Sequence, residues 1–191
     1  AICWPEKMQG NRIVNDLVAL IDMAPTLLDI AGIEKMEGMS GRSLLGLLLP
    51  GEDPDYIPRE YVLAGRERHT HARPDNLGYP ARSLRTRDFL YVRNFKSDRW
   101  PAGNPSCDGT PDSTSTGQFK AMVGGFHDVD ASPSKTFLLD EGQNYPGYFK
   151  LAFAKRPSEQ LYDLREDPSC TRNIADDPAH YEILAELSLI L

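Results

Sequence analysis

The stretch "YPARSLRTRDFLYVRNF", residues 79–95, decides the fold class of the second half of the chain. Apolar and polar side chains alternate on both sides of a turn signal at residues 87–88, and this period-two pattern is typical of strands. The stretch therefore predicts a hairpin whose strands are residues 81–86 and 89–94.

The segments that flank the hairpin extend the same pattern. Alternation and composition predict further strands at 61–64 and 160–164. From Asp177 onward, apolar residues recur at helical spacing, and Pro178 stands at the first helical position, where its missing N–H costs nothing. We therefore expect an antiparallel α+β unit that ends in a helix.

The first part of the chain has an α/β texture instead. "AICW", residues 1–4, is interpreted as the tail of a buried strand that the following proline stops. In "NDLVALIDMAPTLLDIAGI", residues 15–33, Asp22 can cap the first turn of a helix that contains Pro25. Gly32 can end that helix in the left-handed conformation.

Two segments read as connections. The acidic, proline-bearing segment 52–60 suits a connector between two units. Residues 97–147 are rich in Pro, Gly, Ser, Asp and Asn and are too long for an ordinary loop. We expect irregular surface structure there, with a short helix near residues 118–123.

Composition and charge exclude several classes of function. The chain has 191 residues, of which 40% are apolar, and a net charge of −7. This charge argues against nucleic-acid binding, which needs a basic surface, and no apolar run of 18 residues exists to span a membrane. We expect neither nucleic acid nor a membrane as a partner. The first residues also lack the features of a signal peptide.

Familiar catalytic and cysteine motifs are missing. Cys3, Cys107 and Cys170 lie far apart without C-x-x-C spacing, which argues against a zinc ribbon or a redox dithiol. Cys107 and Cys170 could pair in an oxidising compartment. The sequence has no H-E-x-x-H, Walker loop or G-x-G-x-x-G, and "GMSG" at 38–41 is too short for G-x-S-x-G.

Positive charge is concentrated in one part of this acidic chain. Residues 65–99 contain nine Lys and Arg against four Asp and Glu, and "GRERHTHARPDN" at 65–76 combines three of these arginines with two histidines. Such a local excess of positive charge can attract an anion to one surface of an acidic protein. Arginine suits this task because its planar fork holds sulfate, phosphate or carboxylate through paired hydrogen bonds.

Two other interpretations of this segment stay open. It could be a solvated loop, since loops are generally exposed. It could also hold a metal through His69 and His71, but a third ligand would be needed, and only Asp75 and His127 are available for that. The shortage of ligands makes us expect no metal site.

Four blocks resemble successive blocks of a known family. They are "DLVALIDMAPTLLDIAGI", "SGRSLLGLL", "YPARSLRTRDFLYVRNF" and "EQLYDLREDPSCTRNIADDP". In this order they resemble the C-terminal half of type I sulfatases, which are formylglycine-dependent enzymes of the alkaline-phosphatase-like superfamily. "RERHTHARPDNLGYPARSLRT" and "KRPSEQLYDL" resemble most the heparan N-sulfatase (sulfamidase)-like branch.

The resemblance implies a division of the chain. Residues 1–55 would be the last strand and helices of the large sulfatase α/β domain, at the C-terminal edge of its α/β sandwich. Residues 56–191 would be the C-terminal subdomain, a small antiparallel four-stranded sheet with a terminal helix and an irregular insertion at about 97–147.

The resemblance also implies an activity for the full-length protein, namely hydrolysis of sulfate esters or sulfamates of a sulfated glycan such as a glycosaminoglycan. The family's nucleophile is a formylglycine made from a cysteine in C-x-P-S-R or C-x-A-x-R, and no cysteine here has that context. The formylglycine, the calcium ligands and the catalytic residues would all lie in the missing N-terminal portion. We therefore expect no catalytic residue in this chain and no activity from the chain alone.

The family's C-terminal subdomain helps to recognise the sugar around the sulfated position. The resemblance therefore implies that Arg66, His69, His71 and Arg73 bind the sulfated sugar. Bacterial sulfatases of the kind that this chain resembles are typically periplasmic or secreted, and we expect the same location here.

The arginines of the hairpin are expected on its solvated face, in ion pairs with Glu67, Asp88 or Asp163. They are Arg82, Arg85, Arg87 and Arg93.

Two alternatives remain. The chain could be a stand-alone module that binds anionic glycans or serves a structural role, although "AICW" makes more sense as the last strand of an existing sheet. It could also belong to a phosphatase or phosphodiesterase of the same superfamily, in which a metal-bound Thr or Ser replaces formylglycine. The "QLYDLREDP" block is not typical of most of those relatives.

Overall fold

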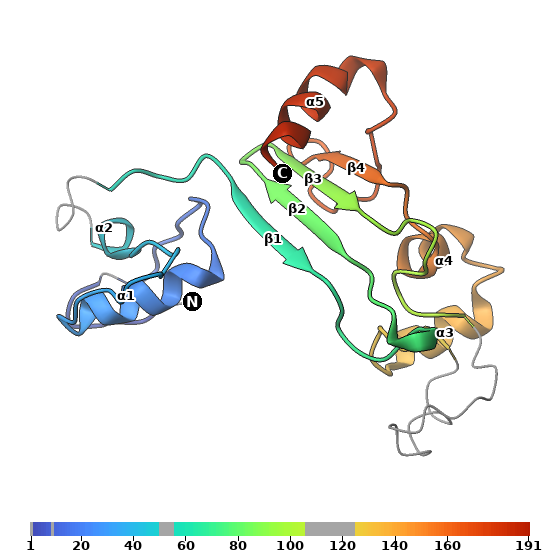
Figure 1. Ribbon diagram of the computed structural model, residues 1–191, viewed down its shortest axis with the longest axis horizontal. Coiled ribbons are helices and arrows are strands. Elements are labelled where there is room, and N and C mark those ends of the chain that lie inside the picture. Colours follow the sequence, from blue (N-terminus) through green and yellow to red (C-terminus); the bar gives the residue numbers. More distant parts are fainter. Residues whose placement is uncertain (1, 9, 50–55, 106–124) are drawn as a thin grey trace. The chain divides into compact units, whose positions relative to one another are not determined.

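The computed structural model describes residues 2–8, 10–49, 56–105 and 125–191. They form two compact units, whose elements are labelled in Figure 1. The first unit comprises Ala1–Leu63 with Arg85–Asp88, and the second comprises Ala64–Leu84 with Phe89–Leu191.

The first unit contains short helices. A 3-10 turn, η1, spans Leu20–Asp22, and it leads into α1, Met23–Ile30, while α2 spans Leu45–Leu48. The helix that the sequence predicts around Pro25 is therefore confirmed. Gly32 follows this helix with a φ of +68°, a left-handed conformation that glycine adopts without a steric cost.

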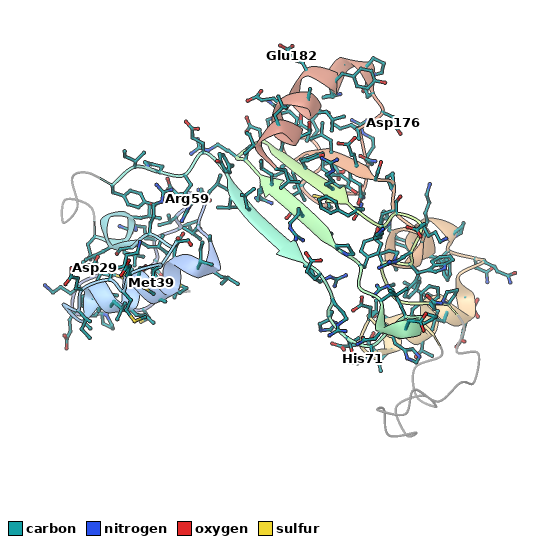
Figure 2. The ribbon with its side chains drawn as sticks, viewed as in Figure 1. Asp29, Met39, Arg59, His71, Asp176 and Glu182 are labelled. Atoms are coloured by element: carbon teal, nitrogen blue, oxygen red, sulfur yellow. The ribbon has the colours of Figure 1, made fainter. Side chains whose placement is uncertain are left out.

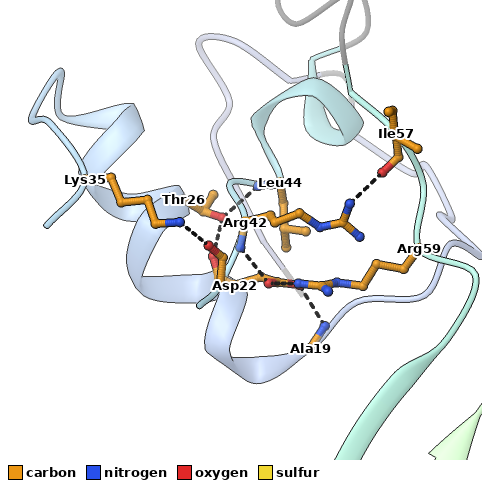
Figure 3. Close-up of polar contacts among 9 residues, drawn as sticks. Ala19, Asp22, Thr26, Lys35, Arg42, Leu44, Ile57 and Arg59 are labelled. Atoms are coloured by element: carbon orange, nitrogen blue, oxygen red, sulfur yellow. Dashed lines mark hydrogen bonds and ion pairs between the residues drawn. The ribbon is translucent and has the colours of Figure 1, made fainter. Parts of the chain in front are cut away.

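The buried carboxylate of Asp22 ties three segments of this unit together (Figure 3). It accepts hydrogen bonds from Nε of Arg59 at 3.1 Å and from the backbone amides of Arg42 at 2.9 Å and Ala19 at 3.0 Å. The hydroxyl of Thr26 donates to the Asp22 carbonyl at 2.5 Å. The sequence predicts that Asp22 caps α1, but its side chain caps the preceding turn and holds two distant segments instead.

The strand predicted from "AICW" is not formed by residues 2–4. Ile2 and Cys3 are exposed. A strand needs a hydrogen-bonded neighbour, and the described part of the chain places none beside these residues.

The second half of the chain forms the four-stranded antiparallel sheet that was expected. Its strands are β1, Val62–Arg66; β2, Ala81–Arg85; β3, Phe89–Asn94; and β4, Glu159–Asp163. Their order in the sheet is β1-β2-β3-β4 (Figure 1). The central hairpin is therefore confirmed, and β4 pairs antiparallel with β3.

The terminal helix packs on this sheet. A 3-10 turn, η3, spans Pro178–His180 and is followed by α5, Tyr181–Ile190, so the predicted helix with Pro178 in its first turn is confirmed. Its buried Leu187 joins a core formed with Leu84, Tyr91, Leu161, Ile174 and Ala175. None of the helices in the described ranges is long and apolar enough to cross a bilayer.

Two helices occupy the end of the segment that was expected to be irregular. They are α3, Pro133–Glu141, and α4, Pro146–Phe153. The prediction of irregular structure over 97–147 is therefore wrong for its last part. The prolines that suggested a loop stand in the first turns of these helices, where proline is favoured.

A second core lies under α3 and α4. Phe126 and Phe153 are buried, and their rings stack with centroids 4.6 Å apart. Trp100 and Ala102 pack against the same cluster. This core fixes the chain on both sides of residues 106–124, which lie outside the described residues, as do Cys107 and the helix predicted near 118–123.

Candidate functional site

The charged segment 65–76 forms a loop that leaves the sheet at the end of β1. It returns through a 3-10 turn, η2, Pro74–Asn76, whose last two residues have positive φ values of 53° and 55°. The base of the loop is closed tightly, because a Cβ atom on Gly78 would lie 2.5 Å from the carbonyl oxygen of Glu67. Figure 1 shows the loop at the end of the sheet where α3 and α4 also lie.

Asp128 is the centre of a charged cluster at this loop. Its side chain is only 2% exposed. Its backbone amide donates to the carbonyl of Ala102 at 3.0 Å, and both Ala102 and the nearby Phe126 belong to the second core. The core therefore holds the carboxylate in place against the loop.

Three cationic or hydrogen-bonding side chains of the loop face this carboxylate. Arg73 Nη2 lies 2.7 Å from Oδ2, His69 Nδ1 lies 3.1 Å from Oδ1, and Arg66 Nη2 lies 3.8 Å from Oδ2. Two guanidinium groups thus face one carboxylate. The cluster therefore carries a net positive charge.

Arg73 supports this cluster from inside the protein. Its side chain is 2% exposed, and it also donates to the carbonyls of Trp100 at 2.8 Å and Pro101 at 2.7 Å. Its guanidinium lies over the ring of Tyr79, 5.6 Å from the centroid. Burial raises the pKa of the Tyr79 phenol, so this ring stays neutral. Arg73 therefore holds Asp128, and it does not have the exposed position that direct contact with a sugar would need.

Arg66 and His69 have the exposure that Arg73 lacks. Their side chains are 47% and 54% exposed. Because Asp128 is a carboxylate, it accepts a hydrogen bond from the Nδ1–H group of His69. The other ring nitrogen, Nε2, is then an acceptor in the neutral imidazole and a donor in the charged form. The cluster can therefore offer fixed donors to an anion.

His71 is exposed on the same loop, where Figure 2 labels it. Within the described ranges, no group of three or more His, Cys, Asp and Glu side chains is placed to hold a metal ion. The described residues therefore do not fit the calcium that the family resemblance implies for the complete enzyme.

The hairpin arginines follow the expectation in part. Arg82 forms the expected ion pair with Glu67. Asp163 pairs with Arg165, two residues further along the chain, because the turn after β4 brings them together. Arg93 lies over the ring of Phe95 at 5.5 Å.

Comparisons with known proteins find similarity to sulfatases. The family described as "N-sulphoglucosamine sulphohydrolase, C-terminal" matches residues 1–64. An ulvan-active sulfatase of Formosa agariphila is 26% identical over 184 residues, which are 96% of this chain and 30% of the relative. The chain is therefore similar to sulfatases over nearly its whole length. A second ulvan-active sulfatase of that organism is 24% identical over 97% of the chain and 26% of its own length.

Solved structures show the same fold. The structure of a 2-O GAG sulfatase superposes with a TM-score of 0.56 at 19% identity, over 97% of this chain and 27% of that one. A protein solved with its substrate D-glucosamine-2-N,6-O-disulfate gives a TM-score of 0.50 at 16% identity, over 98% and 26%. The chain spans less than a third of the length of the curated relatives it matches.

Sequence reasoning missed Asp128, the residue that organises the cluster. Asp128 is 59 positions from His69 and follows a segment without any periodic pattern. Only the surrounding "FHDVD" offers a signal, in the form of acidic residues between apolar ones. No local pattern links such a carboxylate to a distant basic loop.

Proposed function

We propose that the full-length protein is a sulfatase that hydrolyses sulfate esters or sulfamates of a sulfated polysaccharide, and that this region supplies part of its substrate-binding surface. Relatives that match nearly the whole chain are named as ulvan-active sulfatases, which supports the proposal. A neighbour in fold binds a sulfated glucosamine as its substrate.

The observation that carries the binding role is the Asp128 cluster. Arg66 and His69 are about half exposed, and a carboxylate that is itself fixed by buried Arg73 holds them in place. Donors that are fixed before binding lose little conformational freedom when they meet a sulfate group. We therefore assign sugar contact to Arg66, His69 and His71, and a positioning role to Arg73.

The reacting groups belong elsewhere in this proposal. None of Cys3, Cys107 and Cys170 lies in C-x-P-S-R or C-x-A-x-R. Formylglycine would supply the nucleophile and calcium would stabilise the charge of the sulfate, and both would be held by residues outside this chain. The residues described here bind and orient the sugar.

The proposal is tested with the full-length protein, which should release inorganic sulfate from a sulfated polysaccharide. Replacing His69 and His71 together by alanine should raise KM roughly 10-fold or more, because hydrogen bonds to a charged group are lost. The variant should retain most of kcat, since these residues do not contact the reacting bond.

A matched control is His180→Ala, which removes a histidine of η3 whose partner is Asp177. This variant should keep the wild-type KM. An unchanged KM in the double histidine variant would favour the alternative that this segment is a solvated loop without a role in binding. A protein that releases no sulfate from any sulfated glycan would contradict the sulfatase proposal itself.

A further inference from the structure

The loop carries a second basic surface that does not involve Asp128. A shallow groove of about 500 Å³ is lined by Glu67, Arg68, Asn76, Gly78, Pro80 and Arg99. Its volume lies within the roughly 300–1,000 Å³ that small-ligand sites occupy. Arg68 directly precedes His69, so the groove and the Asp128 cluster are built from neighbouring residues of one loop.

Both arginines of the groove contact the backbone of one short stretch of chain. Arg68 Nη1 donates to the carbonyl of Asn76 at 3.4 Å, and Arg99 Nη1 donates to the carbonyl of Gly78 at 2.7 Å. These carbonyls are two residues apart in one short stretch of chain. Each guanidinium has five N–H donors, so most of its donors remain available after this contact.

The charge of these two arginines is not balanced locally. Within the part of the chain that the structure describes, neither Arg68 nor Arg99 forms an ion pair. The one acidic side chain that lines the groove, Glu67, is paired with Arg82. Two positive charges therefore line one groove, and both can attract a bound anion.

We infer that this groove binds an oxyanion substituent, a sulfate or a carboxylate, on a sugar next to the one that the Asp128 cluster contacts. The inference rests on the proposed function, because it extends the same glycan along the loop. The planar guanidinium forks of Arg68 and Arg99 suit the oxygens of either group. The protein would then prefer chains with closely spaced negative charges over single sulfated sugars.

The test compares long and short substrates of the full-length protein. The substrates are a sulfated monosaccharide and three sulfated tetrasaccharides whose neighbouring sugar bears a sulfate, only a carboxylate, or no anion. In Arg68→Ala, the KM for the sulfate-bearing tetrasaccharide, divided by the KM for the monosaccharide, should rise roughly 10-fold. Arg68→Lys should give a smaller rise, because it keeps the charge but loses the fork.

The matched control is Arg172→Ala, which removes one positive charge from a side chain that is 69% exposed and paired with Glu166. Its KM ratio should equal that of the wild type. A ratio that is also unchanged in Arg68→Ala would overturn the groove proposal while leaving the sulfatase proposal intact. An effect of Arg68→Ala that is as large for the tetrasaccharide without a neighbouring anion would overturn it too.

Calorimetric titration of the same tetrasaccharides separates the two proposals. If the protein cleaves no substrate, the sulfatase proposal fails. The measured Kd values still test whether the groove binds the anionic substituent. The Kd of the sulfate-bearing tetrasaccharide should then weaken roughly 10-fold in Arg68→Ala. Equal Kd values for the two proteins, or no binding to the wild type, would overturn the inference. The sulfate and carboxylate substrates identify which group the groove prefers.

Discussion

Asp22 and Asp128 are buried carboxylates, and each is held by an arginine, Arg59 in the first case and Arg73 in the second. Burying a charge costs several kcal/mol, and only a good set of hydrogen bonds offsets this cost. Removing one member of such a pair costs about 3–5 kcal/mol, because the other charge is left uncompensated. Replacing either carboxylate alone should therefore destabilise its unit.

Asp22 should make the stability of the first unit depend on pH. Burial pushes its pKa up, but hydrogen bonds from Arg59 and from the amides of Arg42 and Ala19 outweigh burial, so the pKa lies below the usual 3.8. A carboxyl whose pKa is lower in the folded state stabilises the fold above its unfolded pKa. That stabilisation is lost as the pH falls below 3.8 and through the lowered folded value.

The measurement is the free energy of unfolding of the wild type and of Asp22→Asn in urea at several pH values. The difference between the two proteins should be greatest near neutral pH and should shrink below pH 3.8. A difference that stays constant down to pH 2 would contradict this account.

At the residue level, the sequence predicts the loop but not its partner. The basic cluster with His69 is visible because its residues are consecutive, and the charge excess can be counted. The role of Asp128 could not be predicted, because Asp128 and its partner His69 are 59 positions apart in the sequence. Burial of Arg73 was not predictable either, since arginine is normally exposed and only the second core encloses it.

Among the elements, Asp128 is positioned where the backbone around Gly103 contacts both the loop at Ala72 and the segment at residues 127–128. The backbone amide of Asn104 donates to the carbonyl of Ala72 at 3.1 Å, and the backbone amide of Asp128 donates to the carbonyl of Ala102 at 3.0 Å. Gly103 has a φ of +91°, and a Cβ atom there would lie 2.9 Å from the amide nitrogen of His127. This position therefore requires glycine for both conformation and space.

We predict that Gly103→Ala lowers the free energy of unfolding by about 1–3 kcal/mol, the usual cost of a strained backbone conformation. The matched control is Gly147→Ala in α4, where a Cβ atom would meet nothing within 4 Å. This control should be neutral or slightly stabilising, because alanine is the better helix former. Equal stability of the two variants, measured by urea unfolding, would show that position 103 tolerates a side chain.

The elements that the sequence predicts are those with local signals. The β2–β3 hairpin, α1 with Gly32 behind it, and the terminal helix with Pro178 all follow from alternation, caps or proline positions. α3 was missed because its sequence, PSKTFLLDE, has no apolar residues repeating at helical spacing and its proline resembles a loop signal. Residues 2–4 form no strand here, because a strand needs a hydrogen-bonded neighbour and not composition alone, and the interpretation as the last strand of a larger sheet stays a prediction.

At the scale of the whole molecule, the first unit exposes an unusual amount of apolar surface. Leu20 is 90% exposed and Ile13 is 85% exposed, and Leu27, seven residues after Leu20, is also exposed. Apolar surface of this kind favours association.

We predict that the isolated 191-residue chain self-associates in solution. Its weight-average mass in sedimentation velocity should rise with protein concentration, and replacing Leu20 and Leu27 by glutamate should lower this mass toward that of the monomer. Ser188→Glu, a polar substitution on α5 in the second unit, is the control and should leave the association unchanged. A wild-type chain that stays monomeric over a wide concentration range would contradict the prediction.

The pairing of β3 with β4 has a consequence for how the protein is made. The hydroxyl of Tyr91 on β3 donates to Glu159 on β4, and these residues are 68 positions apart. A ribosome adds roughly 5–20 residues per second, so the edge of β3 waits on the order of 3 to 14 s for its partner strand to be synthesised. During that interval an unpaired strand edge is open to other nascent chains. Slow translation through residues 95–158 should therefore lower the yield of folded protein, and a chaperone that shields this edge should restore it.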